Sequence, residues 1–288
     1  MKSILSRLIL LLIIAISSCN IINPKEDVPT YIKFDSVKVE SVVPAIHGSV
    51  SHKITDVWVY YNRQLLGAYE LPARVPILAS GHGQVQLVAG IWQDGLSGIR
   101  TRYPFYTVDT VDLDASPGNT FHYSPTFRYR TTDTPAVSYF VEDFEQGNSL
   151  IPRYGDTSFV KTSNPADVFE GSWSSKLTLS DTDRYGESST LQSFAFPPTR
   201  PCFLEFNYKS DVPFQLDVYV TTLSGNTSTI SLTGINPSSK WNKLYFNFGG
   251  FVATYQNASF RFIFHASLPA DKTTGSVWLD NFKIIHFN

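Results

Sequence analysis

Short runs of alternating apolar and polar residues recur along the whole chain, and Gly, Pro, Asn and Asp separate them. No stretch of ten or more residues has a convincing helical period. A period of two is typical of strands that bury one face. The aromatic content of 14%, which comes mainly from 21 Phe and 15 Tyr, also favours strands. The pattern therefore predicts an all-β chain.

The N-terminus carries the features of an export signal. A short basic region precedes an apolar run from Leu8 to Ile16, which is far shorter than the roughly 20 residues that span a bilayer. The run ends in Ile16-Ser17-Ser18-Cys19, which resembles the lipobox of bacterial lipoproteins. The resemblance implies a signal peptide over residues 1–18 and lipidation of Cys19. An ordinary cleaved signal with a chance cysteine is the alternative.

The rest of the chain is long enough for one large or two medium domains. Residues 19–30 contain two prolines and charged residues without an apolar period, which predicts a lipidated tether. A second polar segment with a proline predicts a linker over 131–137. We therefore expect one β-sandwich over 31–130 and another over 138–288. The formal net charge of −2 gives no basic field for nucleic acid.

The first predicted domain contains a hairpin signal. Val57–Tyr61 and Leu65–Tyr69 flank a predicted turn at Asn62-Arg63-Gln64. Ser80–Gly83 predicts another turn, and Gln84–Gly90 predicts a half-buried strand. The order of these features over about residues 50–95 resembles small immunoglobulin-like or PEGA-like envelope domains. That resemblance implies a β-sandwich with a spacer or interaction role.

The second half has a sharper order of short motifs. Asp143-Phe144-Glu145 opens it, Cys202–Tyr208 lies near its middle, and Val277–Phe282 closes it. Their order and spacing over 138–288 resemble MAM-type adhesion domains and the carbohydrate-binding modules of bacterial glycan-degrading systems. The resemblance implies a jelly roll. Cys202 stands where a MAM domain has a disulfide cysteine, but its partner is absent, which puts the MAM label in doubt.

Strand parity in this half separates an apolar side from a polar side. Alternate residues such as Leu204 and Phe206, or Phe260, Phe262 and Phe264, predict the sandwich core. The opposite side carries aromatic and polar residues, a combination that suits sugars, since rings stack on aromatic faces and planar polar groups bind hydroxyls. A solvated face with one Trp beneath a loop is the alternative. The predicted ligand-binding residues are Trp241, Tyr245, Tyr219, Asp217, Arg261 and His265.

A calcium site follows only from the resemblance to carbohydrate-binding jelly rolls, which often hold this ion between their first and last strands. Calcium takes six to eight oxygen ligands from carboxylates and carbonyls. The matching positions are Asp143, Glu145 and Asp280. The alternative is that these carboxylates cap turns or pair with lysines.

No catalytic motif is present in the sequence. The six histidines have no metal-ligand spacing, and neither a nucleophile elbow nor a phosphate loop occurs. The leading hypothesis is a non-enzymatic lipoprotein of the outer membrane or cell surface that binds a glycan or another extracellular polymer. A structural or protein-interaction subunit of an envelope or secretion complex is the main alternative, and a hydrolase without recognisable motifs is a third.

Overall fold

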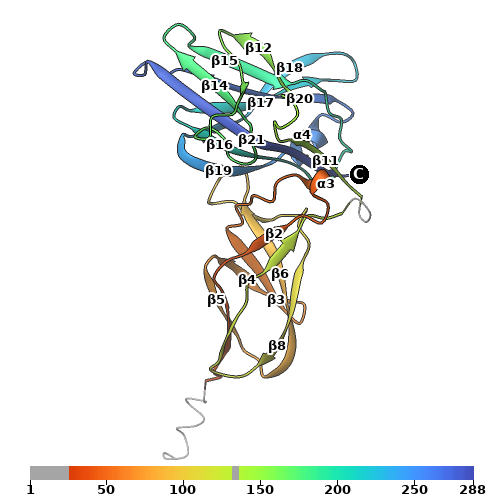
Figure 1. Ribbon diagram of the computed structural model, residues 1–288. Helices are drawn as coiled ribbons and strands as arrows, with labels where there is room; N and C mark the ends of the chain where they lie inside the picture. Colours follow the sequence, from red (N-terminus) through yellow and green to blue (C-terminus); the bar gives the residue numbers. More distant parts are fainter. Residues whose placement is uncertain (1–25, 132–135) are drawn as a thin grey trace, which may run out of the picture.

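The computed structural model describes residues 26–131 and 136–288 and confirms the all-β class. Two β-sandwich domains are stacked, with one end of the N-terminal domain against the C-terminal domain (Figure 1). Within the described residues only two short helices occur, α3 (Pro44–His47) and α4 (Gly249–Thr254). None of the helices in these residues is long and apolar enough to cross a membrane.

The N-terminal domain has two layers around one core. Strands β5-β1-β9, together with the pair β10-β2, form one layer, and β4-β3-β6-β7 forms the other, with β8 also paired to β6. Inward side chains from both layers, such as Phe34 and Val59, are completely buried. The strands are β1 (Thr30–Phe34), β2 (Lys38–Glu40), β3 (Asp56–Tyr61), β4 (Gln64–Glu70), β5 (Ala73–Ile77), β6 (Gly81–Trp92), β7 (Arg100–Arg102), β8 (Asp109–Ala115), β9 (Thr120–His122) and β10 (Thr126–Arg128).

The predicted hairpin is confirmed as β3 and β4. Its turn residues Asn62 and Arg63 both have positive φ, at 47° and 69°, as a two-residue hairpin turn requires. The turn predicted at Ser80–Gly83 is wrong, because β6 begins at Gly81 and continues through it. Gly83 lies against the Tyr61 ring, where a Cβ atom would be only 2.1 Å from the hydroxyl oxygen. A larger residue at position 83 would clash with Tyr61, so Gly83 permits the close packing of the two strands.

The C-terminal domain is a jelly roll of two packed sheets. The first sheet is β13-β14-β21-β16-β19, with β11 paired to β21, and the second sheet is β12-β15-β20-β17-β18. The strands are β11 (Val137–Glu142), β12 (Leu150–Gly155), β13 (Val160–Thr162), β14 (Ser174–Ser180), β15 (Tyr185–Thr190), β16 (Cys202–Ser210), β17 (Phe214–Thr221), β18 (Thr227–Ile235), β19 (Ser238–Asn247), β20 (Ser259–Ser267) and β21 (Thr274–Phe287).

The core prediction for this domain is confirmed. Leu204 and Phe206 from the first sheet and Phe260, Phe262 and Phe264 from the second are all buried in one cluster. Burial of this alternating apolar side stabilises the sandwich, because each large side chain contributes roughly 1.5–3 kcal/mol when it leaves water. The outward residues of the two sheets consequently point in opposite directions.

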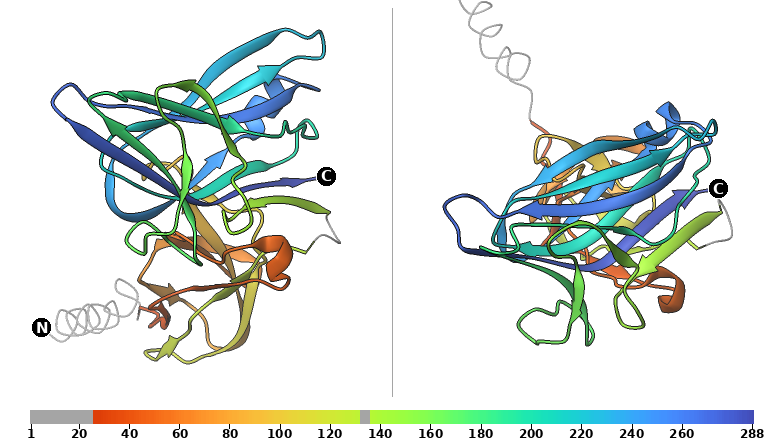
Figure 2. Two further views of the ribbon diagram at one scale, coloured as in Figure 1. Left: turned by 45° about the horizontal axis from the view of Figure 1, so that its top comes forward. Right: turned by 90° about the horizontal axis from the view of Figure 1, so that it is seen from above.

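The two domains share buried residues at their junction. Phe203, Tyr245 and Ile285 of the first sheet belong to the apolar cluster of the N-terminal domain. The first sheet therefore faces the N-terminal domain, and the second sheet lies on the far side of the molecule (Figures 1 and 2). Of the predicted linker, residues 132–135 lie outside the described part of the chain, and β11 already begins at Val137.

Candidate functional site

The structure divides the six predicted ligand residues between two faces. Trp241 and Tyr245 lie on β19 in the first sheet, whereas the other four lie on β17 and β20 in the second. The prediction of one shared face is wrong, because β19 pairs with β16 and not with β17 or β20. Parity correctly identified the side of each strand that points out of the sandwich, but the strands belong to different sheets.

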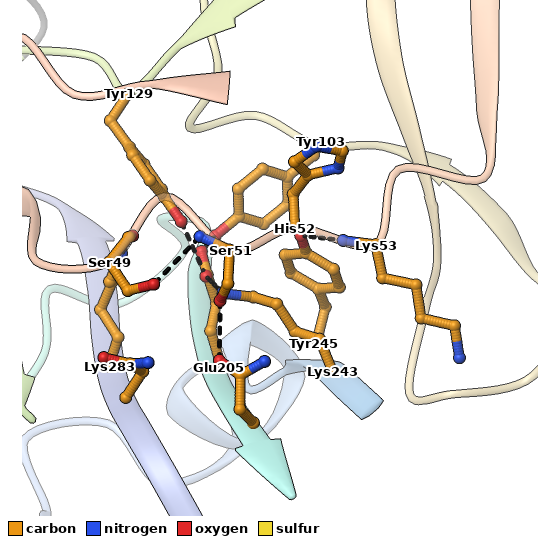
Figure 3. A network of polar contacts seen from close by, with 12 residues as sticks. Ser49, Ser51, His52, Lys53, Tyr103, Tyr129, Glu205, Lys243, Tyr245 and Lys283 are labelled. Carbon is orange, nitrogen blue, oxygen red and sulfur yellow. Dashed lines mark hydrogen bonds and ion pairs between the residues drawn. The ribbon is translucent and has the colours of Figure 1, made fainter. Parts of the chain in front are cut away.

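Tyr245 lies inside the domain junction and is only 1% exposed. Its hydroxyl accepts a hydrogen bond from the backbone N–H of Lys53 at 3.1 Å, and it lies 3.3 Å from the Tyr106 hydroxyl. Both partners come from the N-terminal domain, and Figure 3 shows Lys53 beside Tyr245. A ligand cannot reach this ring while the two domains are in contact.

A buried ionic network surrounds Tyr245, and we call it the junction network. Glu205 is fully buried and forms an ion pair with Lys243 at 2.7 Å. It also accepts hydrogen bonds from the hydroxyls of Tyr103 and Tyr129 of the N-terminal domain. Lys283 donates to the Ser49 carbonyl at 3.1 Å and lies over the Tyr129 ring (Figure 3). The network thus connects both domains without any exposed member.

Burial and charge shift the titration of this network. Burial would raise the pKa of Glu205, but the nearby Lys243 and Lys283 ammonium groups outweigh it and hold that pKa below its ordinary value. Burial lowers the pKa of Lys283 to about 7, and the Glu205 carboxylate opposes this shift only in part. Removing one member of such a cluster leaves the others charged and unpaired in a dry site. The network is a structural connection between the domains, closed to ligands.

Trp241 lies on the uncovered part of the first sheet and is half-buried. The Phe169 ring, from the segment between β13 and β14, lies 5.3 Å from it, and the Lys209 ammonium group lies over it at 5.4 Å. The same ammonium group lies 4.4 Å from the Trp278 ring. Trp241 therefore packs against neighbours of its own domain, and the sandwich core separates it from the four predicted residues on the second sheet.

The outward side of the second sheet brings the remaining four predicted residues together, and we call it the outer face. Strand register places His265 beside Glu187 and Gln215, and Tyr219 beside Arg261. The outer face is made of Tyr154, Tyr185, Glu187, Asp217, Tyr219, Arg261 and His265, together with Arg153. It faces away from the N-terminal domain (Figure 2).

Arg153 holds the outer face together across four strands. It starts on β12 and pairs with Glu187 on β15. It also donates to the Thr229 hydroxyl on β18 at 3.3 Å, and its guanidinium lies 5.2 Å from the Tyr219 ring on β17. A planar guanidinium with several fixed contacts loses little conformational freedom when a ligand arrives. The outer face is therefore organised before it binds anything.

His265 and Asp217 form a second pair on this face. The His265 Nε2 atom lies 3.0 Å from an Asp217 oxygen, and both side chains are about 15% exposed, at 15% and 14%. The other Asp217 oxygen is buried and has no hydrogen-bond partner among the described residues. The Tyr185 hydroxyl donates to Glu187 at 2.6 Å, and burial together with that carboxylate raises the pKa of Tyr185. These contacts fix the donors and acceptors in place.

The outer face has the components of a sugar-binding surface. Tyr154 is 73% exposed and its ring lies 5.9 Å from Tyr185. Tyrosine presents a large apolar ring to a sugar while its hydroxyl bonds to polar groups. Carboxylate, imidazole and guanidinium groups next to such rings can bind hydroxyls in fixed directions. This arrangement supports binding of a polar polymer.

Sequence reasoning missed Arg153, Tyr154, Tyr185 and Glu187. The inward side of β15 carries Gly186, Ser188 and Thr190, so no apolar alternation marks this strand. Pro152 similarly weakens the strand signal in β12. The alternation of Tyr185 and Glu187 on the outward side was the available signal.

The three carboxylates of the calcium prediction have protein partners. Glu145 accepts hydrogen bonds from the backbone N–H groups of Ser172 and Trp173 at 2.8 and 2.9 Å. Asp280 is 1% exposed and accepts one from the Ser174 hydroxyl at 2.5 Å, and its burial raises its pKa to about 7.

Asp143 is exposed and accepts a hydrogen bond from the Glu145 backbone N–H at 3.1 Å. In the part of the chain that the structure describes, no three His, Cys, Asp or Glu side chains come together where they could hold a metal ion. The predicted trio does not converge on one point, and calcium binding stays a prediction.

The lipidation prediction concerns Cys19, which lies outside the described residues together with the predicted signal peptide. The first described residues lie at the end of the N-terminal domain that is farthest from the C-terminal domain (Figure 1). Cys202, the other cysteine, is buried at the start of β16, and burial raises the pKa of its thiol.

Comparisons with known proteins found no protein-family model and no curated protein that matches the chain. Among solved structures, the chain is similar to the CBM22-1 xylan-binding domain of Paenibacillus barcinonensis Xyn10C, with 18% identity, a TM-score of 0.39, and coverage of 52% of this chain and 94% of that chain. It is also similar to a family 11 carbohydrate-binding module of Clostridium thermocellum, solved with a mixed-linked tetrasaccharide, with 14% identity, a TM-score of 0.37, and coverage of 51% and 94%.

Proposed function

We propose that this chain is a non-enzymatic binding protein that holds a glycan or a similar extracellular polymer on its outer face. The observation that carries the proposal is the organisation of that face. Tyr154, Tyr185 and Tyr219 lie among charged groups that are already fixed by Arg153 and by the pair of His265 and Asp217. The N-terminal domain covers part of the opposite face, around Phe203, Tyr245 and Ile285.

Charge pairing on the outer face suits a polar, flexible ligand. Arg153 and Glu187 form an ion pair, and the Asp217 carboxylate already contacts the His265 ring, so a ligand does not need to supply a counter-charge for either pair. Bound sugars gain from ring stacking and from hydrogen bonds to groups that have already lost their freedom. Both pairs can bind a ligand without a chemical reaction, which supports a binding role.

We further propose that Cys19 is lipidated and that the protein is anchored at the outer membrane or cell surface. The first described residues lie at the end of the molecule opposite the second sheet (Figure 1). An anchor attached there would place the outer face on the side away from the membrane. The N-terminal domain, which we assign to the immunoglobulin-like type, would act as a spacer whose orientation is fixed by the junction network.

Binding of the full chain, purified in detergent, to an oligosaccharide panel tests the outer face. Tyr219→Ala should weaken binding by about 1–3 kcal/mol, the range of a stacking anchor. Tyr60→Ala is the matched control, because Tyr60 is also an outward tyrosine that contacts an arginine, but it lies in the N-terminal domain. Absence of any glycan binding, or equal losses in both variants, would contradict the proposal.

A further inference from the structure

A groove continues the outer face at one end of the second sheet. It encloses a volume of about 420 Å³ at the ends of β17, β18 and β20 and the segment that follows β20. His265 belongs both to the groove and to the outer face, and Gln215 lies beside it on β17. The volume falls within the range of about 300–1,000 Å³ that is typical of small-molecule sites. A polymer on the outer face can therefore extend into the groove without leaving the protein surface.

The lining of the groove contains one titratable side chain, His265. Its polar groups include the side-chain amides of Gln215 and Asn236 and the hydroxyl of Ser267, and Pro213 and Pro269 supply apolar surface. No Asp, Glu, Lys or Arg is among the described residues that line it. His265 is held by Asp217 at 3.0 Å, so its polar ring edge already has a carboxylate partner.

This lining suits uncharged sugar units better than anionic ones. Amide groups can donate to and accept from sugar hydroxyls, and the apolar residues can contact the ring carbons of a sugar. A carboxylate or sulfate group in the groove would lose water without gaining a cation, which is unfavourable. We propose that the groove is a subsite for one uncharged sugar unit of the polymer, so that the protein binds neutral glycans. The inference rests on the proposed glycan binding at the outer face.

Gly234 offers a direct way to close the groove. It lines the groove from β18, and a Cβ atom added at this position would meet no other atom within 4 Å. Gly234→Leu should therefore fill the groove without displacing protein atoms. Gly98→Leu is the matched control, since Gly98 has equally open surroundings but lies in the N-terminal domain.

The experiment measures binding of the full chain to neutral oligosaccharides of glucose, mannose, galactose and xylose, and to oligogalacturonate as the acidic probe. We expect binding of at least one neutral probe, a loss of about tenfold or more with Gly234→Leu, and no loss with Gly98→Leu. Should a thermal melt show that Gly234→Leu is unfolded, Asn236→Ala replaces it with the same expected direction.

The outcomes separate the groove from the outer face. Neutral binding that survives closure of the groove, or binding of oligogalacturonate alone, would overturn the subsite while leaving glycan binding intact. If no probe binds the unaltered chain, the proposed function itself fails, and the subsite with it.

Discussion

The two sheets of the jelly roll carry similar outward residues but place them in different environments. On the first sheet, Glu205, Lys243 and Tyr245 point outward and are buried by a second domain. On the second sheet, Glu187, His265 and Tyr219 also point outward, but they face away from the N-terminal domain. Outward charge and aromatic content therefore identify a face of a sandwich, whereas its use depends on whether another domain covers it.

The largest expected difference between the faces concerns stability. Glu205→Gln should lower the free energy of unfolding by about 3–5 kcal/mol, because it leaves the Lys243 ammonium group without its carboxylate partner in a buried site. Glu187→Gln should cost clearly less, since its partner Arg153 is exposed enough for water to replace the lost carboxylate. Denaturant unfolding of both variants measures the difference. Equal losses of unfolding free energy would mean that the junction network contributes no more to stability than the ion pair on the outer face.

The pH dependence of stability should also come from the covered face. Lys283 has a pKa of about 7 in the folded protein, below its ordinary value of 10.5, so the unfolded chain binds one more proton between these values. Stability should then rise with pH from about 7 toward 9.5, by up to about 1.4 kcal/mol per pH unit from this group. Lys283→Met should remove the rise. A melting temperature that falls over this pH range in the unaltered chain would contradict the assignment.

Trp241 tests the uncovered part of the first sheet. It is half-buried against Phe169 and Lys209, so Trp241→Ala should cost about 1–2 kcal/mol of stability through lost packing. Glycan binding at the outer face should be unchanged, because the sandwich core separates the two surfaces. Thermal melts and panel binding of this variant measure both effects. Lost binding in a fully folded variant would move the binding site to the first sheet.

Calcium should have the smallest effect. Glu145 and Asp280 already accept two short hydrogen bonds each from protein groups, and a cation would have to replace or share these oxygens. We expect the melting temperature in excess calcium and in chelator to agree within about 1 °C, because a ligand that does not bind the folded state cannot stabilise it. A rise of several degrees with calcium would support the predicted site.

Much of the fold could be predicted from the sequence because alternation reports burial within a sandwich. The Phe/Leu side of β16, β17, β19 and β20 was identified from parity alone. Sheet membership could not be obtained in this way, since β17 and β19 have the same pattern and lie in different sheets. Half of the outer face also escaped prediction, because β15 has small or polar residues on its inward side.

The covered face did leave a signal in the sequence. Phe203 and Ile285 occupy outward positions on β16 and β21, beside the charged Glu205 and Lys283. Apolar residues among charged ones on an outward strand side are typical of a surface that another part of the protein covers. The identity of the covering domain could not be read from that signal, because the contacts of Tyr103 and Tyr129 are far away in the sequence.

Footprinting of the bound state tests the central claim most directly. Side-chain oxidation of the full chain should be compared with and without a bound neutral oligosaccharide from the panel. We predict protection of Tyr154, Tyr185 and Tyr219 on the outer face, with Trp241 and Trp278 unchanged. Protection of the two tryptophans, with the three tyrosines unaffected, would contradict it and assign binding to the first sheet.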